Sequence, residues 1–123
     1  MTTLTVAGTK DHPITIGPIA ERVLVVWRGR TIGASKQALE LREAHYPPVV
    51  YVPRADMDMS ALKRTARVTT CPYKGEANYF SIIDGELRDD NAVWTYETPK
   101  ADVAEIASHL AFYPDKVEIT REG

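Results

Sequence analysis

The sequence contains a single cysteine, Cys71, in a chain of 123 residues. One cysteine excludes an intramolecular disulfide, so a hydrophobic core must hold the fold together. The longest continuous apolar run, at 23–27, is far shorter than the roughly 20 residues that a membrane-spanning helix needs. The first residues also lack the basic stretch and apolar run of a secretory signal. We therefore expect a cytoplasmic protein without a membrane partner.

The sequence also lacks the spacings of common metal, phosphate and nucleic-acid sites. The three histidines and the cysteine show no C-x-x-C or H-x-x-x-H spacing, and there is no glycine-rich phosphate loop. We predict no metal site. The sequence does not indicate whether the protein binds another cofactor. The formal net charge is -2, which gives no overall attraction to nucleic acid, and no aromatic-basic motif of a known nucleic-acid module occurs. We expect no nucleic-acid partner.

What is present indicates one folded domain, 1–123, with a single core. Apolar residues make up 44% and charged residues 26% of the chain, which is typical of globular proteins. Most apolar residues alternate or form short runs between turn residues, as strands do. The expected strands lie at 12–17, 21–29, 30–35, 37–46, 47–53, 66–70, 76–86 and 87–97, with a last one through Val117 and Ile119. Turns are expected at Gly29 and at Asp84-Gly85.

Only the segment 98–110 has a clear helical repeat. Thr98 suits the N-cap, Pro99 suits the first helical position, and the apolar residues at 103, 106, 107 and 110 share one face. A single helical turn is expected at 59–65. The segment 37–46 is ambiguous, since its residues suit both a helix and a strand, and its alternation favours a strand. We therefore predict a mainly β protein with one short helix near the C-terminus that packs on the sheet.

The cysteine lies in the run CPYKG, three residues before Lys74. Pro72 fixes its own φ and Gly75 tolerates a left-handed conformation, so we predict a tight turn over 71–75. A cation beside a thiol favours the reactive thiolate, which makes Cys71 a candidate nucleophile. The alternative is a small buried apolar Cys71 beside a solvent-facing lysine, because free cysteine is among the most buried residue types.

Positive charge is concentrated around this turn. The segment 54–74 carries five cationic residues against only Asp56 and Asp58, a charge of +3, so the rest of the chain carries -5. A local positive field favours an anionic ligand such as a carboxylate or a phosphate. The alternative is that these side chains simply point to water.

Aromatic side chains accompany the cations and are suited to form the walls of a ligand site. The alternative is that they lie at the edge of the core with their polar tips in solvent. The predicted ligand-binding residues are Tyr51, Arg54, Lys74, Tyr79 and Trp94. If 37–46 is a strand, Glu43 and His45 share one of its faces, and His45 is then a candidate base for Cys71.

Several sequence blocks, taken in order, resemble the bacterial family of domains of unknown function number 427. The blocks are HPITI near the start, IGAS at 32–35, YVPRADM at 51–57, CPYKGEANYF at 71–80, AVWTYETP at 92–99 and LAFYPDKVEI at 110–119. The most specific part is the C-P-x-K-G run followed by Tyr79, with a Y-x-P-x-x-D run upstream. The resemblance covers nearly the whole chain. It implies a compact, mainly β protein of curled antiparallel sheets, as a tent or a partly open barrel, with a short helix near the end.

The same family is also labelled a nucleotidyltransferase domain, without an established reaction. Such enzymes of the polymerase-β type use a Gly-Ser pair before a helix and an Asp-x-Asp pair that holds two divalent metals. This chain has G-A-S at 33–35 and D-M-D at 56–58, but the glycine and serine are not adjacent and no clear third carboxylate follows. The alternative is that both aspartates cap the segment after them. No catalytic metal ligand is therefore carried over.

Three hypotheses for the function follow. The first is a small ligand-binding module with a pocket for an anionic small molecule near the C-P-x-K-G turn. The second is a cysteine-dependent enzyme or redox sensor that uses Cys71. The third is nucleotidyl transfer through Asp56 and Asp58. The reaction, the ligand and the oligomeric state are left open by the sequence.

Overall fold

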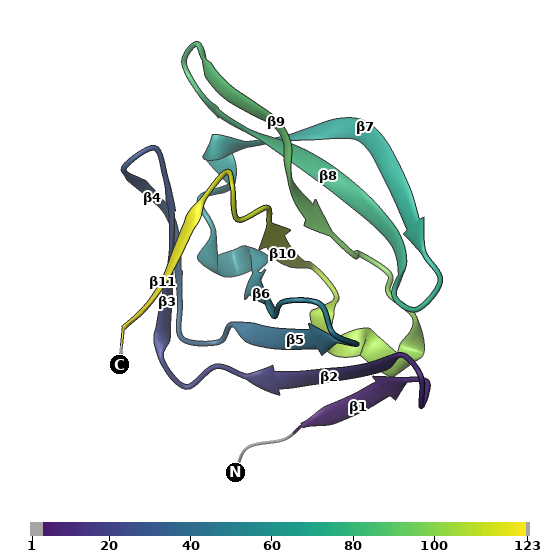
Figure 1. Ribbon diagram of the computed structural model, residues 1–123. Helices are drawn as coiled ribbons and strands as arrows, with labels where there is room; N and C mark the ends of the chain where they lie inside the picture. The colour runs from purple at the N-terminus through teal and green to yellow at the C-terminus, as the bar shows by residue number, and fades with distance from the viewer. Residues whose placement is uncertain (1–3, 123) are drawn as a thin grey trace.

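The computed structural model describes residues 4–122, and strands dominate it (Figure 1). Eleven strands occur in this part of the chain. They are β1 (Thr5–Gly8), β2 (Pro13–Pro18), β3 (Arg22–Trp27), β4 (Arg30–Ser35), β5 (Leu39–Glu43), β6 (Val49–Pro53), β7 (Leu62–Cys71), β8 (Gly75–Asp84), β9 (Leu87–Thr95), β10 (His109–Phe112) and β11 (Glu118–Glu122). The predicted mainly β fold is confirmed.

The strands form two antiparallel sheets that do not close into a barrel. The larger sheet has the order β1-β2-β5-β6-β10-β9-β8-β7, and the smaller one has the order β11-β3-β4. In Figure 1 the larger sheet curls, with β1, β2 and β5 at the bottom, β7, β8 and β9 at the top, and β6 and β10 between them. The smaller sheet stands along the left side. The curled, partly open arrangement agrees with the one that the family resemblance implied.

Three hairpin turns lie where the sequence predicted them, and each contains a residue with a positive φ. Arg28 and Gly29 have φ of 50° and 81° between β3 and β4, which matches the mirror-image turns that suit the twist of two strands. Gly85, with φ of 61°, lies in the turn between β8 and β9. Cys71 pairs with Gly75 across the CPYKG turn, where Gly75 has φ of 112°. The tight turn over 71–75 is therefore confirmed.

The ambiguous segment 37–46 contains a strand, but a shorter one than predicted. β5 ends at Glu43 because Ala44 takes a left-handed conformation with φ of 48°. His45 therefore lies in the exposed turn after the strand. The expectation that Glu43 and His45 share a strand face is wrong.

The predicted helix at 98–110 is reduced to a 3-10 helix, η3 (Ala101–Ile106), which is interrupted at Val103. Its N-cap is Lys100 rather than Thr98, and there is no side-chain cap. Val103 and Ile106 of the predicted apolar face are fully buried, whereas Ala107 is the half-buried C-cap and Leu110 lies in β10. The helix stops because residues 109–112 pair with both β6 and β9 as strand β10. Sheet pairing thus outweighs the local helical preference.

Two further 3-10 helices connect β6 to β7. They are η1 (Arg54–Asp56) and η2 (Met59–Ala61). The second lies where a single helical turn was expected, and the Asp58 carboxylate accepts a hydrogen bond from the Ser60 backbone N–H at its N-cap. Capping by Asp58 is therefore confirmed.

Buried side chains form two hydrophobic clusters. The first cluster joins the two sheets, with Val25 and Trp27 of the smaller sheet and Val52, Phe80 and Val93 of the larger one among its members. The second cluster lies within the curl of the larger sheet beneath η3, and its buried members are Ile14, Ile16, Leu41, Tyr51, Ala77, Tyr79, Tyr96, Val103, Ile106 and Ala111. Burying one large aliphatic side chain contributes about 1.5–3 kcal/mol, so these two clusters hold the scaffold on which the site is built.

Candidate functional site

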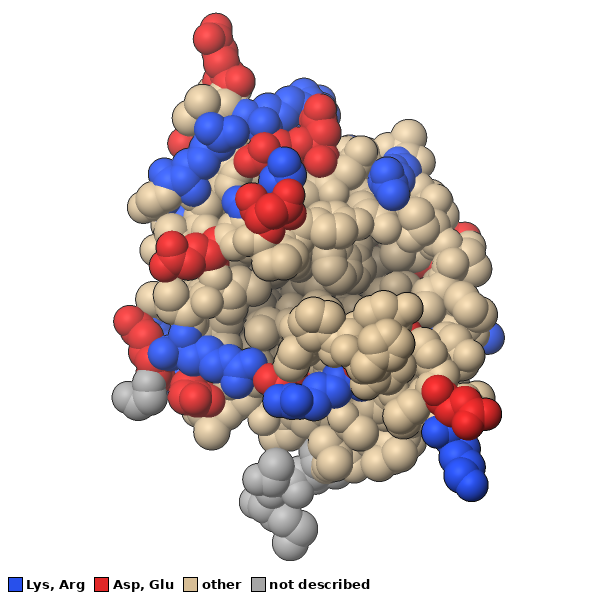
Figure 2. All heavy atoms as spheres, in the orientation of Figure 1, with Lys and Arg blue, Asp and Glu red and all other residues tan. Residues whose placement is uncertain are grey.

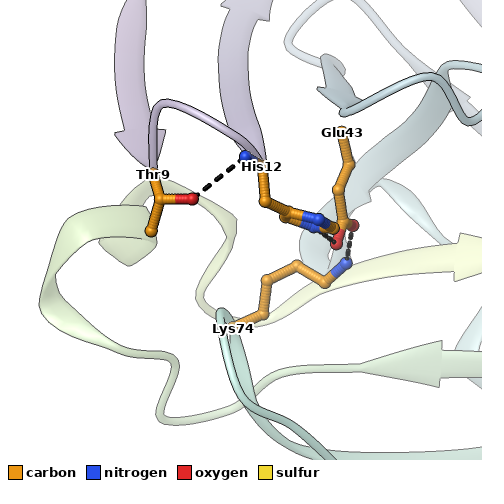
Figure 3. A network of polar contacts seen from close by, with 4 residues as sticks. All are labelled: Thr9, His12, Glu43 and Lys74. Atoms are coloured by element: carbon orange, nitrogen blue, oxygen red, sulfur yellow. Dashed lines mark hydrogen bonds and ion pairs between the residues drawn. The ribbon is translucent and has the colours of Figure 1, made fainter.

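The turn between β7 and β8 directs Lys74 inward, onto the carboxylate at the end of β5. The Lys74 ammonium donates a hydrogen bond to Glu43 Oε1, and His12 Nε2 lies 2.7 Å from Glu43 Oε2. The side chains of Lys74 and Glu43 are only 11% and 14% exposed. Figure 3 shows the carboxylate between its two partners. The alternative in which Lys74 points to solvent is therefore wrong.

The loop before β2 holds His12 in place. The His12 backbone N–H donates to Thr9 Oγ1 over 3.0 Å (Figure 3). The imidazole stacks on Tyr73 of the CPYKG turn, with ring centroids 4.0 Å apart and planes 7° from parallel. Three segments that are distant in the sequence are thus joined at one carboxylate.

Glu43 is ionised in this arrangement. Burial alone would raise its pKa, but hydrogen bonds from Lys74 and His12 outweigh that effect and hold the pKa below its usual value. The negative charge of Glu43 neutralises the ammonium of Lys74. The turn consequently offers no free cation to a ligand at this point.

Cys71 lies on the second cluster and is partly exposed. Burial raises the pKa of the nearby Tyr51 and Tyr96 phenols, so both stay protonated at neutral pH. Lys74 Nζ lies 5.9 Å from the centroid of the Tyr96 ring. The sulfur, the amine and the phenol rings therefore gather in one region. His45, the candidate base, instead stacks on Tyr46 in the exposed turn after β5.

Two of the other predicted ligand-binding residues lie on different hydrophobic clusters. Arg54 pairs with Glu97 over 3.5 Å and lies above the Phe80 ring, on the side of the first cluster. Tyr79 is buried in the second cluster, and its hydroxyl is 2.9 Å from Thr69 Oγ1.

Carboxylates from elsewhere in the chain engage much of the positive segment 54–74. Arg64 donates two hydrogen bonds to Glu97, the same carboxylate that pairs with Arg54. Glu43 takes Lys74. These acidic partners lie outside the segment, so its charge of +3 does not appear as one open cationic surface.

A groove with a volume of about 660 Å³ opens where the two hydrophobic clusters meet. It runs between the 46–50 segment and the C-terminal part of the chain. Its lining residues are Tyr46, Pro47, Pro48, Val49, Val50, Trp94, Phe112, Pro114, Val117, Glu118, Ile119 and Arg121. Figure 2 shows a hollow in the middle of this face, surrounded mainly by uncharged residues. Trp94 is the predicted ligand-binding residue that lines it.

The sequence did not indicate most of this groove. Ile119 and Arg121 reach it because β11 pairs with β3, about a hundred residues earlier in the chain. The sequence did contain one signal for the groove, which is Tyr46 followed by two prolines. An exposed aromatic side chain beside two prolines marks a non-strand surface segment that is free to form a wall.

Arg121 at the charged end of the groove is held by Glu40, which lies outside the groove lining. Arg121 Nη2 donates to Glu40 Oε2 over 2.6 Å, and Arg42 Nε donates to Glu40 Oε1 over 2.8 Å. The hydrogen bond from Arg121, together with that from Arg42, holds the pKa of Glu40 below its usual value. Two guanidinium groups thus share one carboxylate, but of these three side chains only Arg121 lines the groove, and Glu118 gives that lining an equal negative charge. Glu118, also at the groove, is exposed.

The groove and the turn region are connected through one hydrogen bond. Trp94 Nε1 donates to the Tyr51 hydroxyl over 3.3 Å. The Trp94 ring also packs against Tyr113, with centroids 4.8 Å apart. A molecule lying on Trp94 would therefore be one side chain away from the cluster beneath the CPYKG turn.

The two aspartates of the D-M-D run form hydrogen bonds that support the fold. Asp56 accepts a hydrogen bond from Ser35 Oγ over 2.6 Å, and Asp58 accepts one from Arg30 over 2.7 Å in addition to capping η2. Within residues 4–122, no group of three or more His, Cys, Asp or Glu side chains is placed to hold a metal ion.

A family model described as a domain of unknown function (DUF427), labelled NTP_transf_9, matches residues 15–123. The chain belongs to the DUF427 family. This confirms the resemblance carried by the six sequence blocks. No curated protein matches this chain. The description of DUF427 assigns no reaction, so a function for this DUF427 protein must be argued from its geometry. In the part of the chain that the structure describes, no helix has the length and apolarity needed to cross a membrane.

Proposed function

We propose that this DUF427 protein is a small-molecule binding module whose site is the groove between the 46–50 segment and β11. The observation that carries the proposal is the groove itself, with its volume of about 660 Å³ and a wall of apolar and aromatic side chains. Sites for small organic molecules typically measure about 300–1,000 Å³ and have such walls with a few polar groups. The broad faces of Trp94 and Tyr46 suit a flat, apolar ligand body.

The charged end of the groove favours an anionic group on the ligand. Arg121 lines the groove and gives one hydrogen bond to Glu40, so its guanidinium, which has five N–H donors, keeps others for a ligand. A carboxylate or sulfonate accepts strong, charge-assisted hydrogen bonds from a guanidinium. We infer a ligand with a flat apolar body and one anionic group directed at Arg121.

This proposal keeps the ligand close to the C-P-x-K-G turn, because Tyr51 joins Trp94 to the cluster beneath that turn. The ligand-binding roles of Arg54, Lys74 and Tyr79 stay predictions, since none of the three lines the groove. The proposal treats residues 1–123 as one domain that acts in the cytoplasm.

A thermal-shift screen with aryl carboxylates and their matched uncharged amides tests the proposal. A ligand at 100 times its dissociation constant stabilises the folded state by about 2.7 kcal/mol. We expect several acids to raise the melting temperature more than their amides do. If no aryl anion shifts the melting temperature, the proposal is wrong.

Two matched variants locate the binding. Tyr46 lines the groove and is 57% exposed, whereas Leu87 lies outside it and is 50% exposed. Because both side chains are exposed, both alanine variants should fold. By calorimetric titration, Tyr46→Ala should weaken binding by about 2- to 12-fold, the range given by an aromatic contact of about 0.5–1.5 kcal/mol. Leu87→Ala should bind as the wild type does. Equal loss in both variants would place the ligand elsewhere.

Arg121→Gln and Glu118→Gln test the charge argument. Removing the guanidinium should abolish the preference for acid over amide, a change of about tenfold for a hydrogen bond to a charged group. Removing the exposed carboxylate of Glu118 should strengthen binding of the acid and leave the amide unchanged. Identical behaviour of acid and amide in all three proteins would contradict an anionic ligand.

Thiol chemistry at Cys71 is the second candidate. The observation that favours it is the partly exposed cysteine on the phenol-rich second cluster. A poised nucleophile should react with iodoacetamide faster in the folded protein than in the urea-unfolded chain. Slower reaction in the folded protein would end this hypothesis. Nucleotidyl transfer is not proposed, because Ser35, Arg30 and the cap of η2 already engage Asp56 and Asp58.

A further inference from the structure

Strand β7 is a long free edge of the larger sheet. It spans ten residues, and β8 is its only strand neighbour in the part of the chain that the structure describes. Figure 1 shows it running along the outside of the fold, away from the smaller sheet. Ten residues of strand extend over roughly 33 Å. Such an edge presents unpaired backbone N–H and C=O groups to other chains. The opposite edge, β1, has only four residues and packs beside η3.

The first part of the edge is cationic. β7 contains Lys63, Arg64 and Arg67 and no acidic residue. Arg64 is held by Glu97, and Arg67 lies over the Tyr79 ring at 4.9 Å from its centroid. The ion pairs formed within residues 4–122 leave Lys63 and Arg67 without a carboxylate. Val68, beside Arg67, is 49% exposed. The strand thus offers two free cations and one apolar side chain to an incoming segment.

Charge decides which occupant fits. Two copies of this chain joined through antiparallel β7 strands would gather Lys63 and Arg67 of both copies along one seam, where their like charges repel. An extended acidic segment would place carboxylates beside Lys63 and Arg67 instead. We propose that β7 binds an acidic peptide in extended form, which adds to the larger sheet as a further strand. The acidic side chains pair with the cations, and an apolar residue covers Val68.

The pairing of β7 with β8 also limits where such a peptide pairs. The ladder is interrupted between Arg64 and Val68, where Thr65 donates a side-chain hydrogen bond to Asn91 over 2.6 Å. Irregularities of this kind disturb strand addition locally. The added strand therefore pairs with the regular stretches 62–64 and 68–71, and its acidic side chains reach Lys63 and Arg67 beside the irregularity.

The test uses fluorescein-labelled peptides of alternating glutamate and valine, eight residues long, measured by fluorescence anisotropy. The controls replace glutamate by lysine, or carry N-methyl groups on alternate backbone nitrogens. We expect the acidic peptide to bind, the lysine peptide to bind at least tenfold more weakly, and the N-methyl peptide to lose binding because it cannot form the ladder. Equal binding of the N-methyl peptide would overturn strand addition.

Matched charge reversals in the protein complete the test. Arg67→Glu should weaken binding of the acidic peptide by about tenfold or more. Lys36→Glu, an exposed reversal outside β7, should leave it nearly unchanged at the same salt concentration. Equal losses in both variants, or a β7-dependent dimer in sedimentation that excludes the peptide, would overturn the proposal. Tyr46→Ala should bind the peptide normally, so this result is independent of the groove.

Discussion

The indole N–H of Trp94 donates a hydrogen bond to the buried hydroxyl of Tyr51, 3.3 Å away. Trp94 is half-buried in the wall of the groove, whereas Tyr51 belongs to the cluster on which Cys71 packs. This bond connects the two regions of the molecule that bear on function. The position of the indole, and hence the shape of the groove, depends on an acceptor that lies beneath the C-P-x-K-G turn.

Tyr51→Phe should destabilise the protein by about 1 kcal/mol, because it removes the acceptor of the Trp94 indole N–H. For a domain of this size, that corresponds to a drop of several degrees in melting temperature. Thermal unfolding followed by circular dichroism measures it. Tyr46→Phe is the control, since Tyr46 is exposed, and it should melt as the wild type does. Equal melting temperatures for both variants would mean that the bond contributes nothing.

Glu43→Gln should destabilise the protein by about 3 kcal/mol, because it leaves the buried ammonium of Lys74 without its counter-charge. Urea unfolding measures the loss. The double variant Glu43→Gln with Lys74→Met should be more stable than Glu43→Gln alone, since no unpaired charge then stays buried. If the effects of the two substitutions simply add, Lys74 and Glu43 are not coupled in solution.

Acid should weaken the fold through the same carboxylate. The folded protein holds the pKa of Glu43 below its ordinary value of 4.5. The stabilisation is therefore complete above pH 4.5, and it is lost as the pH falls from there through the lower folded pKa. The free energy of unfolding from urea titrations should fall as the pH drops below 4.5, and it should fall less steeply in Glu43→Gln. Parallel curves for the two proteins would exclude Glu43 as a source of the pH dependence.

Gly75→Ala should destabilise the protein by about 1–2 kcal/mol, because an L-residue is strained at a positive φ. Gly75 has φ of 112°, while an added Cβ would meet no atom closer than 3.5 Å, so backbone strain is the only cost. Gly17→Ala is the control, since its φ is not in the left-handed region and its Cβ would meet only the end of the Leu4 side chain. A similar small effect at both positions would contradict the assigned turn geometry.

Alternation and turn residues identified most strands, because both signals are local. The predicted helix at 98–110 was wrong in extent because residues 109–112 find two strand partners that are distant in the sequence. Strand β1 was also missed. It is a four-residue edge strand whose apolar Val6 is exposed, so it carries little of the burial pattern that marks a strand.

The candidate site was harder to predict, since its character depends on partners that are far apart in the sequence. Glu43 lies 31 residues before Lys74, and Glu97 lies 33 residues after Arg64. No local pattern reveals that these carboxylates neutralise the positive segment. The groove likewise exists only after β11 has paired with β3.

The most direct test of ligand binding in the groove is an NMR titration that follows the two tryptophan indole N–H resonances. The chain has two tryptophans, and Trp27 is buried in the first cluster with its Nε1 hydrogen-bonded to Asp89 over 2.7 Å. An aryl carboxylate should shift the Trp94 resonance saturably and leave that of Trp27 in place. If no member of the panel moves the Trp94 resonance, or if both resonances move together, the groove is not the binding site.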